Sequence, residues 1–168
     1  MMRTLISTWL AATFFVLLAP PALADRAAYR GILDLKKTSD TLSVEHHHDW
    51  STPTHLSSLR AVDRTSGKEL FDKAVPAITY LWISADSQYI VGLSNIKYLN
   101  QYQLIVLSRS GRELLKQDIS TLDWAQSTAS VTNWLNWYKT PAPRIALDES
   151  THTLRVEDAG GVMRSFQL

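Results

Sequence analysis

The chain has 168 residues, and its 17 basic residues face 16 acidic ones. Arg3 is the only charged residue before position 25, so the remaining chain of about 144 residues carries no net charge. This balance excludes the broad basic field of a general nucleic-acid binder and the polybasic patch of a membrane-surface protein. The complete absence of cysteine excludes a disulfide scaffold, thiolate zinc sites and thiol catalysis. With 45% hydrophobic residues, six Gly and six Pro, the composition is that of a folded domain.

The first 24 residues have the three parts of an export signal. Arg3 supplies the positive end, Leu10–Leu18 forms a short apolar run, and the small residues Ala22 and Ala24 suit a signal peptidase. The apolar run is shorter than the roughly 20 residues that cross a bilayer. We therefore expect cleavage after Ala24, export to a bacterial periplasm with no membrane attachment after cleavage, and a single domain over 25–168.

The remaining chain alternates short apolar and polar stretches that are broken by turn dipeptides, which predicts strands and hairpins. We expect a hairpin with strands at Tyr80–Ile83 and Tyr89–Leu93, and a second with strands at Leu104–Leu107 and Glu113–Ile119. Three further strands are expected at Arg144–Leu147, Thr153–Glu157 and Val162–Leu168. The segment Leu122–Lys139, between the second hairpin and these three strands, has poor helix interior residues and is predicted to be a loop followed by a strand.

Three segments align as internal repeats, each ahead of a turn glycine. Leu59–Asp63 precedes Gly67, Leu104–Ser108 precedes Gly111, and Leu154–Asp158 precedes Gly161, so that the glycines are 44 and 50 residues apart. Each unit therefore has room for about four strands.

The middle unit resembles a blade of the β-propeller repeat proteins. The resemblance rests on Ser84–Val91, followed by Gln103–Leu107 and the turn Arg109–Arg112. It implies an all-β fold of antiparallel hairpins in about three blade-like repeats. Three blades are too few to close a ring, for which four to eight are typical. We expect an open, incomplete propeller-like stack; the alternatives are half of a ring completed by dimerisation, and a β-sandwich.

The tract Glu45–Asp49 contains three consecutive histidines. In an extended strand His46 and His48 would share one face, and imidazole is a common ligand of zinc and copper. A catalytic zinc needs a third ligand, which would have to be His55 or His152. The other interpretation is a solvated loop between two hairpins, and we predict no metal site, with His46, His48 and His55 as the weak candidates.

Motifs of catalysis are missing from the sequence. There is no G-x-S-x-G elbow, no phosphate loop and no G-x-G-x-x-G. Asp63, Asp86, Asp148 and Asp158 all fall at expected strand ends or turns, where Asp is favoured because its side chain bonds nearby backbone. We therefore predict no catalytic residue, no cofactor and no enzymatic activity.

Recognition of a partner is the remaining class of function. The segment Ser94–Tyr102 is a long polar and aromatic insertion between two strands, which is typical of binding loops. Trp82 and Trp134 are expected in the core, whereas Trp124 is expected to be exposed. The predicted partner-contacting residues are Asn95, Tyr98, Asn100, Tyr102, Arg109, Ser110 and Trp124.

In size, export signal and all-β plan the chain resembles the periplasmic immunity proteins of type VI secretion effectors. The resemblance implies a non-enzymatic inhibitor that blocks the cleft of a secreted peptidoglycan hydrolase, with Ser110 or Asn100 at the tip of the inserted loop. The alternative is a periplasmic ligand- or metal-binding β-protein that uses the His46–His55 region. A third possibility is an assembly subunit that dimerises into a six-bladed ring, so both a monomer and a homodimer are open. We expect no nucleic-acid partner.

Overall fold

The computed structural model describes residues 31–49, 57–94, 102–118, 142–157 and 162–168. Within these ranges the chain forms eleven strands in three antiparallel sheets and no helix. The first sheet consists of β1 (Ile32–Thr38), β2 (Leu42–Asp49), β3 (Ser57–Asp63) and β4 (Glu69–Val75). The second consists of β5 (Tyr80–Ile83), β6 (Tyr89–Leu93), β7 (Leu104–Ser108) and β8 (Glu113–Gln117), and the third of β9 (Ile145–Asp148), β10 (Thr153–Glu157) and β11 (Met163–Gln167).

In each sheet the order of the strands follows the chain, so each sheet is a meander of consecutive hairpins. The predicted all-β, antiparallel fold is confirmed. The hairpins expected in the second and third sheets are also confirmed, with bounds that differ by one or two residues where both ends are described. The segments 119–141 and 158–161, which include Trp124, Trp134 and Asp158, lie outside the described residues.

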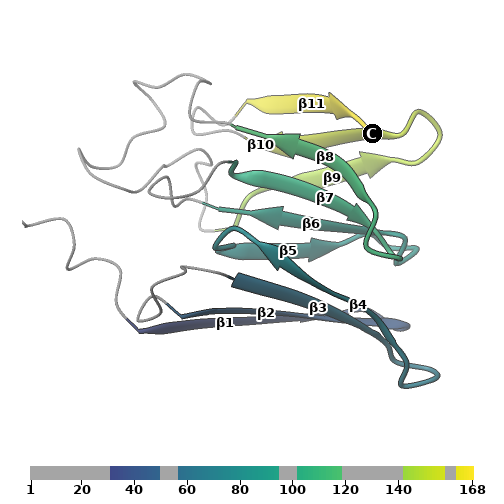
Figure 1. The fold of residues 1–168 in the computed structure, drawn as a ribbon. Coiled ribbons are helices and arrows are strands. Elements are labelled where there is room, and N and C mark those ends of the chain that lie inside the picture. The colour runs from purple at the N-terminus through teal and green to yellow at the C-terminus, as the bar shows by residue number, and fades with distance from the viewer. Residues whose placement is uncertain (1–30, 50–56, 95–101, 119–141, 158–161) are drawn as a thin grey trace, which may run out of the picture.

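The three sheets stack face to face, with the second sheet in the middle (Figure 1). Ile105 and Leu107 of β7 belong to the apolar cluster shared with the first sheet, whereas Leu104 and Val106 belong to the cluster shared with the third. Because successive residues of a strand point to opposite faces, a strand covered on both sides has no polar alternation. This is why β7 is a continuous apolar run.

The repeat seen in the sequence has a structural counterpart. The aligned segments form β3, β7 and β10. β3 and β7 are each the third strand of their sheets, and β10 is the second described strand of its sheet. The pairing of β3 with β4 shifts register between Ala61 and Val62, and that of β7 with β8 shifts between Val106 and Leu107. These are the same positions of the alignment, so the first two units share a bulge, which increases the local twist of the strands.

One end of the stack carries the short turns that join β1 to β2, β3 to β4, β5 to β6, β7 to β8 and β9 to β10. Hydrogen bonds of these turns and of the adjoining strand ends place them together, for example Ser39 Oγ to Ser87 Oγ at 2.7 Å and Tyr89 Oη, at the start of β6, to His152 Nδ1 at 3.1 Å. We call this region, residues 39–41, 64–68, 84–88, 109–112 and 149–152, the turn end; it lies at the right of Figure 1.

The turn aspartates behave as the sequence predicts. Asp63 Oδ1 accepts hydrogen bonds from the amides of Thr65 and Ser66 at 2.9 and 2.8 Å. Asp86 accepts from the amide of Gln88, and Asp148 accepts from the amides that follow it in the same way. These carboxylates stabilise turns, as expected of Asp at such positions.

Two further findings concern apolar residues. Trp82, expected in the core, is half-buried and packs against the cluster between the second and third sheets. No helix among the described residues is long and apolar enough to cross a membrane.

Candidate binding surface

Arg109 joins the first and second sheets at the turn end. Its Nη2 lies 2.6 Å from Oδ2 of Asp63 and 3.2 Å from the carbonyl oxygen of Thr41, and its Nη1 donates to Oγ1 of Thr41 at 3.0 Å. A further contact of 3.4 Å reaches the carbonyl oxygen of Ser87. The guanidinium thus bonds to three other turns, because its planar fork can donate several hydrogen bonds at once.

The environment of Asp63 keeps its carboxylate charged. The pKa of Asp63 is lowered from 3.8 to about 2, first by the hydrogen bond from the Ser66 amide and then by Arg109. A carboxylate that accepts several hydrogen bonds favours its ionised form. The contact with Arg109 is therefore a charged pair throughout the neutral and mildly acidic range.

Ser110 lies at the exposed tip of the turn that Arg109 anchors. Behind it Gly111 has a φ of 82° and is buried against Phe71 of β4. Lys73 Nζ donates to the carbonyl oxygen of Gly111 at 2.8 Å. The turn is therefore held from both sides by the first sheet, while the predicted contact residue Ser110 faces outward.

Beside this turn lies a hollow of about 390 Å³ between the second and third sheets. The Tyr89 hydroxyl and His152 Nδ1 meet there at 3.1 Å, and His152 has a φ of 50°, which is uncommon for a residue other than Gly. The guanidinium of Arg112 makes no ion pair with any residue that the structure describes. The hollow is lined by Asp86, Gln88, Tyr89, Ser108, Arg112, Leu114, His152 and Leu168.

The predicted contact residue Tyr102 lies away from the turn end, just before β7. It is half-buried against the cluster between the first two sheets, and its ring centroid is 5.2 Å from Lys116 Nζ. Burial raises the pKa of its hydroxyl. The structure thus separates Tyr102 from Arg109 and Ser110, and the other predicted contacts, Asn95, Tyr98, Asn100 and Trp124, lie outside the described residues.

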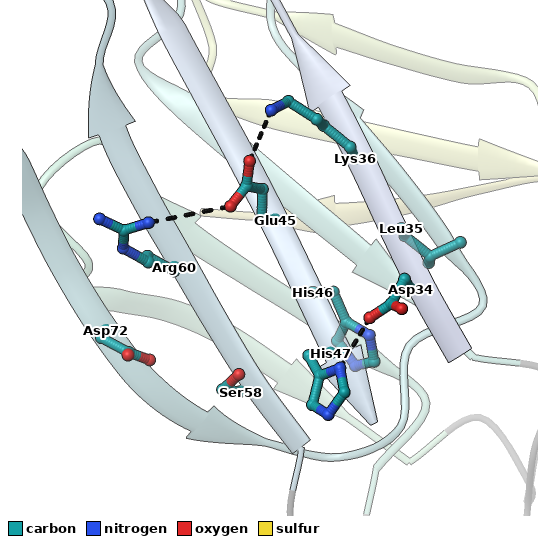
Figure 2. Close-up of a pocket in the computed structure, with 9 residues that line it drawn as sticks. All are labelled: Asp34, Leu35, Lys36, Glu45, His46, His47, Ser58, Arg60 and Asp72. Carbon is teal, nitrogen blue, oxygen red and sulfur yellow. Dashed lines mark hydrogen bonds and ion pairs between the residues drawn. The ribbon is translucent and has the colours of Figure 1, made fainter. Parts of the chain in front are cut away.

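A second surface is the outer face of the first sheet, which no other described sheet covers. Figure 2 shows its side chains. Lys36 Nζ lies 2.6 Å from Glu45, and Arg60 lies 3.9 Å from Glu45 and 2.7 Å from Glu69. These contacts form a ladder of alternating charge across all four strands, and the pKa of Glu45 is lowered by its hydrogen bond from Lys36. Such pairs contribute little stability in water, so the ladder is mainly a solvated face.

The same face aligns Asp34, His47 and Ser58 on three neighbouring strands, within a hollow of about 440 Å³. Asp34 Oδ1 and His47 Nδ1 are 2.7 Å apart, as in a pair in which a carboxylate orients an imidazole base. No hydrogen bond joins the Ser58 hydroxyl to His47, although both are described. The side chains of His47 and Asp34 are 54% and 71% exposed. Asp34, His47 and Ser58 are therefore the residue types of a nucleophilic catalytic site, but water is not excluded from them, and exclusion of water is what strengthens the electrostatic interactions of such a site.

The histidine tract is part of β2, so the loop interpretation is wrong. His46 and His48 point inward and are 1% and 2% exposed, whereas His47 lies on the outer face. His46 Nε2 accepts a hydrogen bond from the Ile78 amide at 3.0 Å, and His48 Nδ1 lies 2.5 Å from Ser57 Oγ. Across the described ranges no three His, Cys, Asp or Glu side chains gather closely enough to hold a metal ion, and His55 lies outside those ranges.

Sequence reasoning missed several residues of these surfaces. It identified Asp63 only as a turn residue, and it did not connect Tyr89 with His152. The only available signal was the repeat, which places Asp63 and Ser108 at equivalent strand ends and so predicts that the turns after them are neighbours.

No protein-family model matches the chain, and comparisons with curated proteins and with solved structures found no match.

Proposed function

We propose that the protein is a binding module that recognises another protein through its turn end, with the turn Ser108–Arg112 at the centre of the contact. The observation that carries this proposal is the anchoring of that turn by Arg109, which leaves Ser110 exposed on a fixed support. A contact loop that is ordered before binding loses little conformational entropy when its partner docks. More of the interaction energy is then available for affinity.

The neighbouring hollow supports the same surface. It presents Tyr89 and Arg112, and tyrosine and arginine are the residue types that often dominate interface energetics. Its volume of about 390 Å³ offers room for a side chain of the partner beside the Ser110 tip. The turn end therefore combines a projecting turn with a recess, which suits a complementary protein surface.

The specific form that we propose is a non-enzymatic inhibitor of a secreted cell-wall hydrolase. This rests on the export signal expected at residues 1–24 and on the proposed contact turn. The Ser110 hydroxyl would enter the hydrolase cleft and hydrogen-bond to its catalytic group. Inhibition would then be steric, and a few anchor residues would determine specificity.

Capture from periplasmic and secreted fractions tests the proposal. The chain from Asp25 to Leu168 is used as bait together with two variants that introduce the same bulky side chain, Ser110→Arg at the turn end and Ala74→Arg on the outer face of the first sheet. We expect a stoichiometric protein partner that Ser110→Arg loses at least tenfold and Ala74→Arg retains. Loss with Ala74→Arg alone would refute the turn end as the contact surface.

A second measurement addresses the inhibitor form. The captured partner is assayed for peptidoglycan hydrolysis with and without the chain. We expect a stoichiometric loss of hydrolysis that Ser110→Arg relieves. A partner without hydrolytic activity, or a hydrolase that stays active in the complex, would leave the binding module standing and exclude the inhibitor.

A further inference from the structure

A buried histidine lies at the point where the chain crosses from the first sheet to the second. His46 is on the inner face of β2, and the segment Pro76–Thr79 connects β4 to β5. The amide of Ile78 donates a hydrogen bond to His46 Nε2 at 3.0 Å. Ile78 is itself buried in the cluster between the two sheets. His46 therefore holds the crossing segment against the first sheet.

This hydrogen bond fixes the protonation of the ring. Because Nε2 accepts from Ile78, it carries no proton, and the neutral ring must hold its proton on Nδ1. That nitrogen is buried and has no hydrogen-bond partner among the described residues. A buried donor without an acceptor is unfavourable, so the neutral arrangement already includes one unsatisfied group.

A carbonyl acceptor lies within reach of the other ring nitrogen, His46 Nε2. The carbonyl oxygen of Pro76 is 3.4 Å from His46 Nε2. While Nε2 accepts from Ile78, it cannot donate to Pro76. Once protonated, Nε2 can donate to Pro76, but it can no longer accept from the Ile78 amide. Protonation of one ring thus exchanges one hydrogen bond of the crossing segment for another.

We propose that His46 is an acid-operated latch between the first and second sheets, which holds the Pro76–Ile78 crossing when the ring is neutral and releases the Ile78 amide when the ring is protonated. Protonation also places a charge between two apolar layers, where it is poorly solvated. Opening of the contact between the first sheet and the rest of the stack is then increasingly favoured as the pH falls. This inference does not depend on the proposed function.

The groups around His46 do not remove the penalty for its charge. His47 and His48 on the same strand disfavour a further positive charge, and Asp34 on β1 favours it weakly. The crossing residues Pro76 to Thr79 have no titratable side chain. Tyr102, just before β7, lines the same small recess as Pro76 and Ile78, and because burial raises the pKa of its hydroxyl it stays neutral.

Burial gives the direction and range of the pH effect. It lowers the pKa of His46 from 6.5 to about 4. Between these values the unfolded chain binds a proton that the folded chain does not, so stability falls as the pH falls below 6.5 and stops falling on this account near pH 4. One such proton increases the unfolding constant up to tenfold per pH unit, or about 300-fold over the whole range.

Urea unfolding of the chain from Asp25 to Leu168 between pH 7.5 and 4 tests the latch. The variant His46→Gln keeps a side-chain oxygen for the Ile78 amide but cannot titrate. We therefore expect the pH dependence of its unfolding constant to be weaker than that of the wild type by up to tenfold per pH unit. The matched variant His47→Gln, on the exposed face of the same strand, should keep the wild-type dependence. An unchanged slope in His46→Gln, or a slope that only His48→Gln removes, would overturn the proposal.

Two measurements on the wild type cover the case in which His46→Gln does not fold. The His46 ring, followed by NMR, should titrate well below pH 6.5, and titration at or above 6.5 would refute the latch. Hydrogen exchange at pH 5, corrected for intrinsic rates, should show the Ile78 amide opening at least tenfold more often than Val106 in the middle of the stack. Equal opening of both amides would mean global unfolding alone and would also contradict the latch.

Discussion

The carboxylate of Asp63 and the guanidinium of Arg109 lie 2.6 Å apart although 46 residues separate them in the chain. Asp63 is the last residue of β3, and Arg109 directly follows the last residue of β7. Because β3 and β7 hold the same place in their sheets, stacking of the sheets brings equivalent turns together. The contact is therefore a consequence of the repeat, and it links adjacent repeats.

The first prediction concerns Arg109 as a structural anchor. Arg109→Met removes its hydrogen bonds to Asp63 and Thr41 and should lower the melting temperature by a few degrees, measured by circular dichroism or calorimetry. Arg112→Met is the matched control, because the Arg112 side chain makes no ion pair or hydrogen bond among the described residues. Equal melting temperatures for the two variants would show that the Arg109 contacts contribute no net stability.

The second prediction concerns the titration of Asp63. Its lowered pKa means that its stabilising contribution is complete above pH 3.8 and is lost as the pH falls towards 2. The carboxyl carbon shift, followed by NMR, should have its midpoint near 2. In Arg109→Met the midpoint should rise but stay below 3.8, because the Ser66 amide, the larger cause, is still present. A midpoint at 3.8 in that variant would contradict this order of causes.

The third prediction compares two glycines at equivalent turns. A Cβ on Gly111 would lie 2.7 Å from the Phe71 ring, whereas a Cβ on Gly67 would meet nothing within 4 Å. Both residues have positive φ, so both substitutions by alanine introduce backbone strain, roughly 1–2 kcal/mol. Gly111→Ala should lose about 1–3 kcal/mol more from overpacking, measured by chemical unfolding. Equal losses would show that Phe71 moves aside freely.

The fourth prediction concerns Gly92 of β6, in the middle of the stack. A Cβ there would lie 2.6 Å from Ile78 Cδ1 and 2.9 Å from Ile105 Cγ2. Gly92→Ala should therefore destabilise the protein by about 1–3 kcal/mol. Ile78→Val removes the atom in closest conflict, so the double variant should be more stable than the sum of the single effects in a double-mutant cycle. If the effects of the two substitutions on the free energy of unfolding were strictly additive, the Ile78 side chain would not be the source of the strain in Gly92→Ala.

The fifth prediction concerns the buried hydroxyl of Ser84. Its Oγ accepts from the amides of Gln88 and Tyr89 at 3.1 and 2.9 Å. Ser84→Ala removes the side-chain acceptor of the Tyr89 amide, whereas the Gln88 amide keeps Asp86 Oδ1 as an acceptor at 3.0 Å. The loss should cost about 1–3 kcal/mol in chemical unfolding. Ser58→Ala, at a half-buried serine whose hydroxyl makes no hydrogen bond within the described part of the chain, should cost much less. A small effect at Ser84 would indicate that another acceptor replaces the hydroxyl.

The hairpins of the second and third sheets were predictable because they combine apolar alternation with turn dipeptides. The first sheet was harder to find. Along β2 the inward positions are Leu42, Val44, His46 and His48, so half of the buried face consists of residues counted as polar. The apolar period was therefore hidden, although burial of these histidines follows from the strand period once the strand is recognised.

The candidate surface was predictable only in part. The turn at Ser110 and Gly111 was identified from its dipeptide, and its exposed tip is where the sequence places it. The role of Arg109 could not be predicted, because its partners Thr41, Asp63 and Ser87 come from three other turns. A sequence pattern indicates local periodicity and turn chemistry, but it does not indicate how far apart two separate hairpins lie in the folded protein.

The sequence by itself determined the strands of the second and third sheets, the turn aspartates and the repeat, because strand period and turn chemistry act over a few residues. Only the tertiary structure decided which faces meet. Stacking the first sheet on the second buries His46 against the Ile78 amide and brings Asp63 to Arg109. Both contacts join segments more than 30 residues apart, so they depend on how the apolar faces of the sheets pack. Because the hydrophobic effect is non-directional, the local sequence of one face does not specify which other face it packs against.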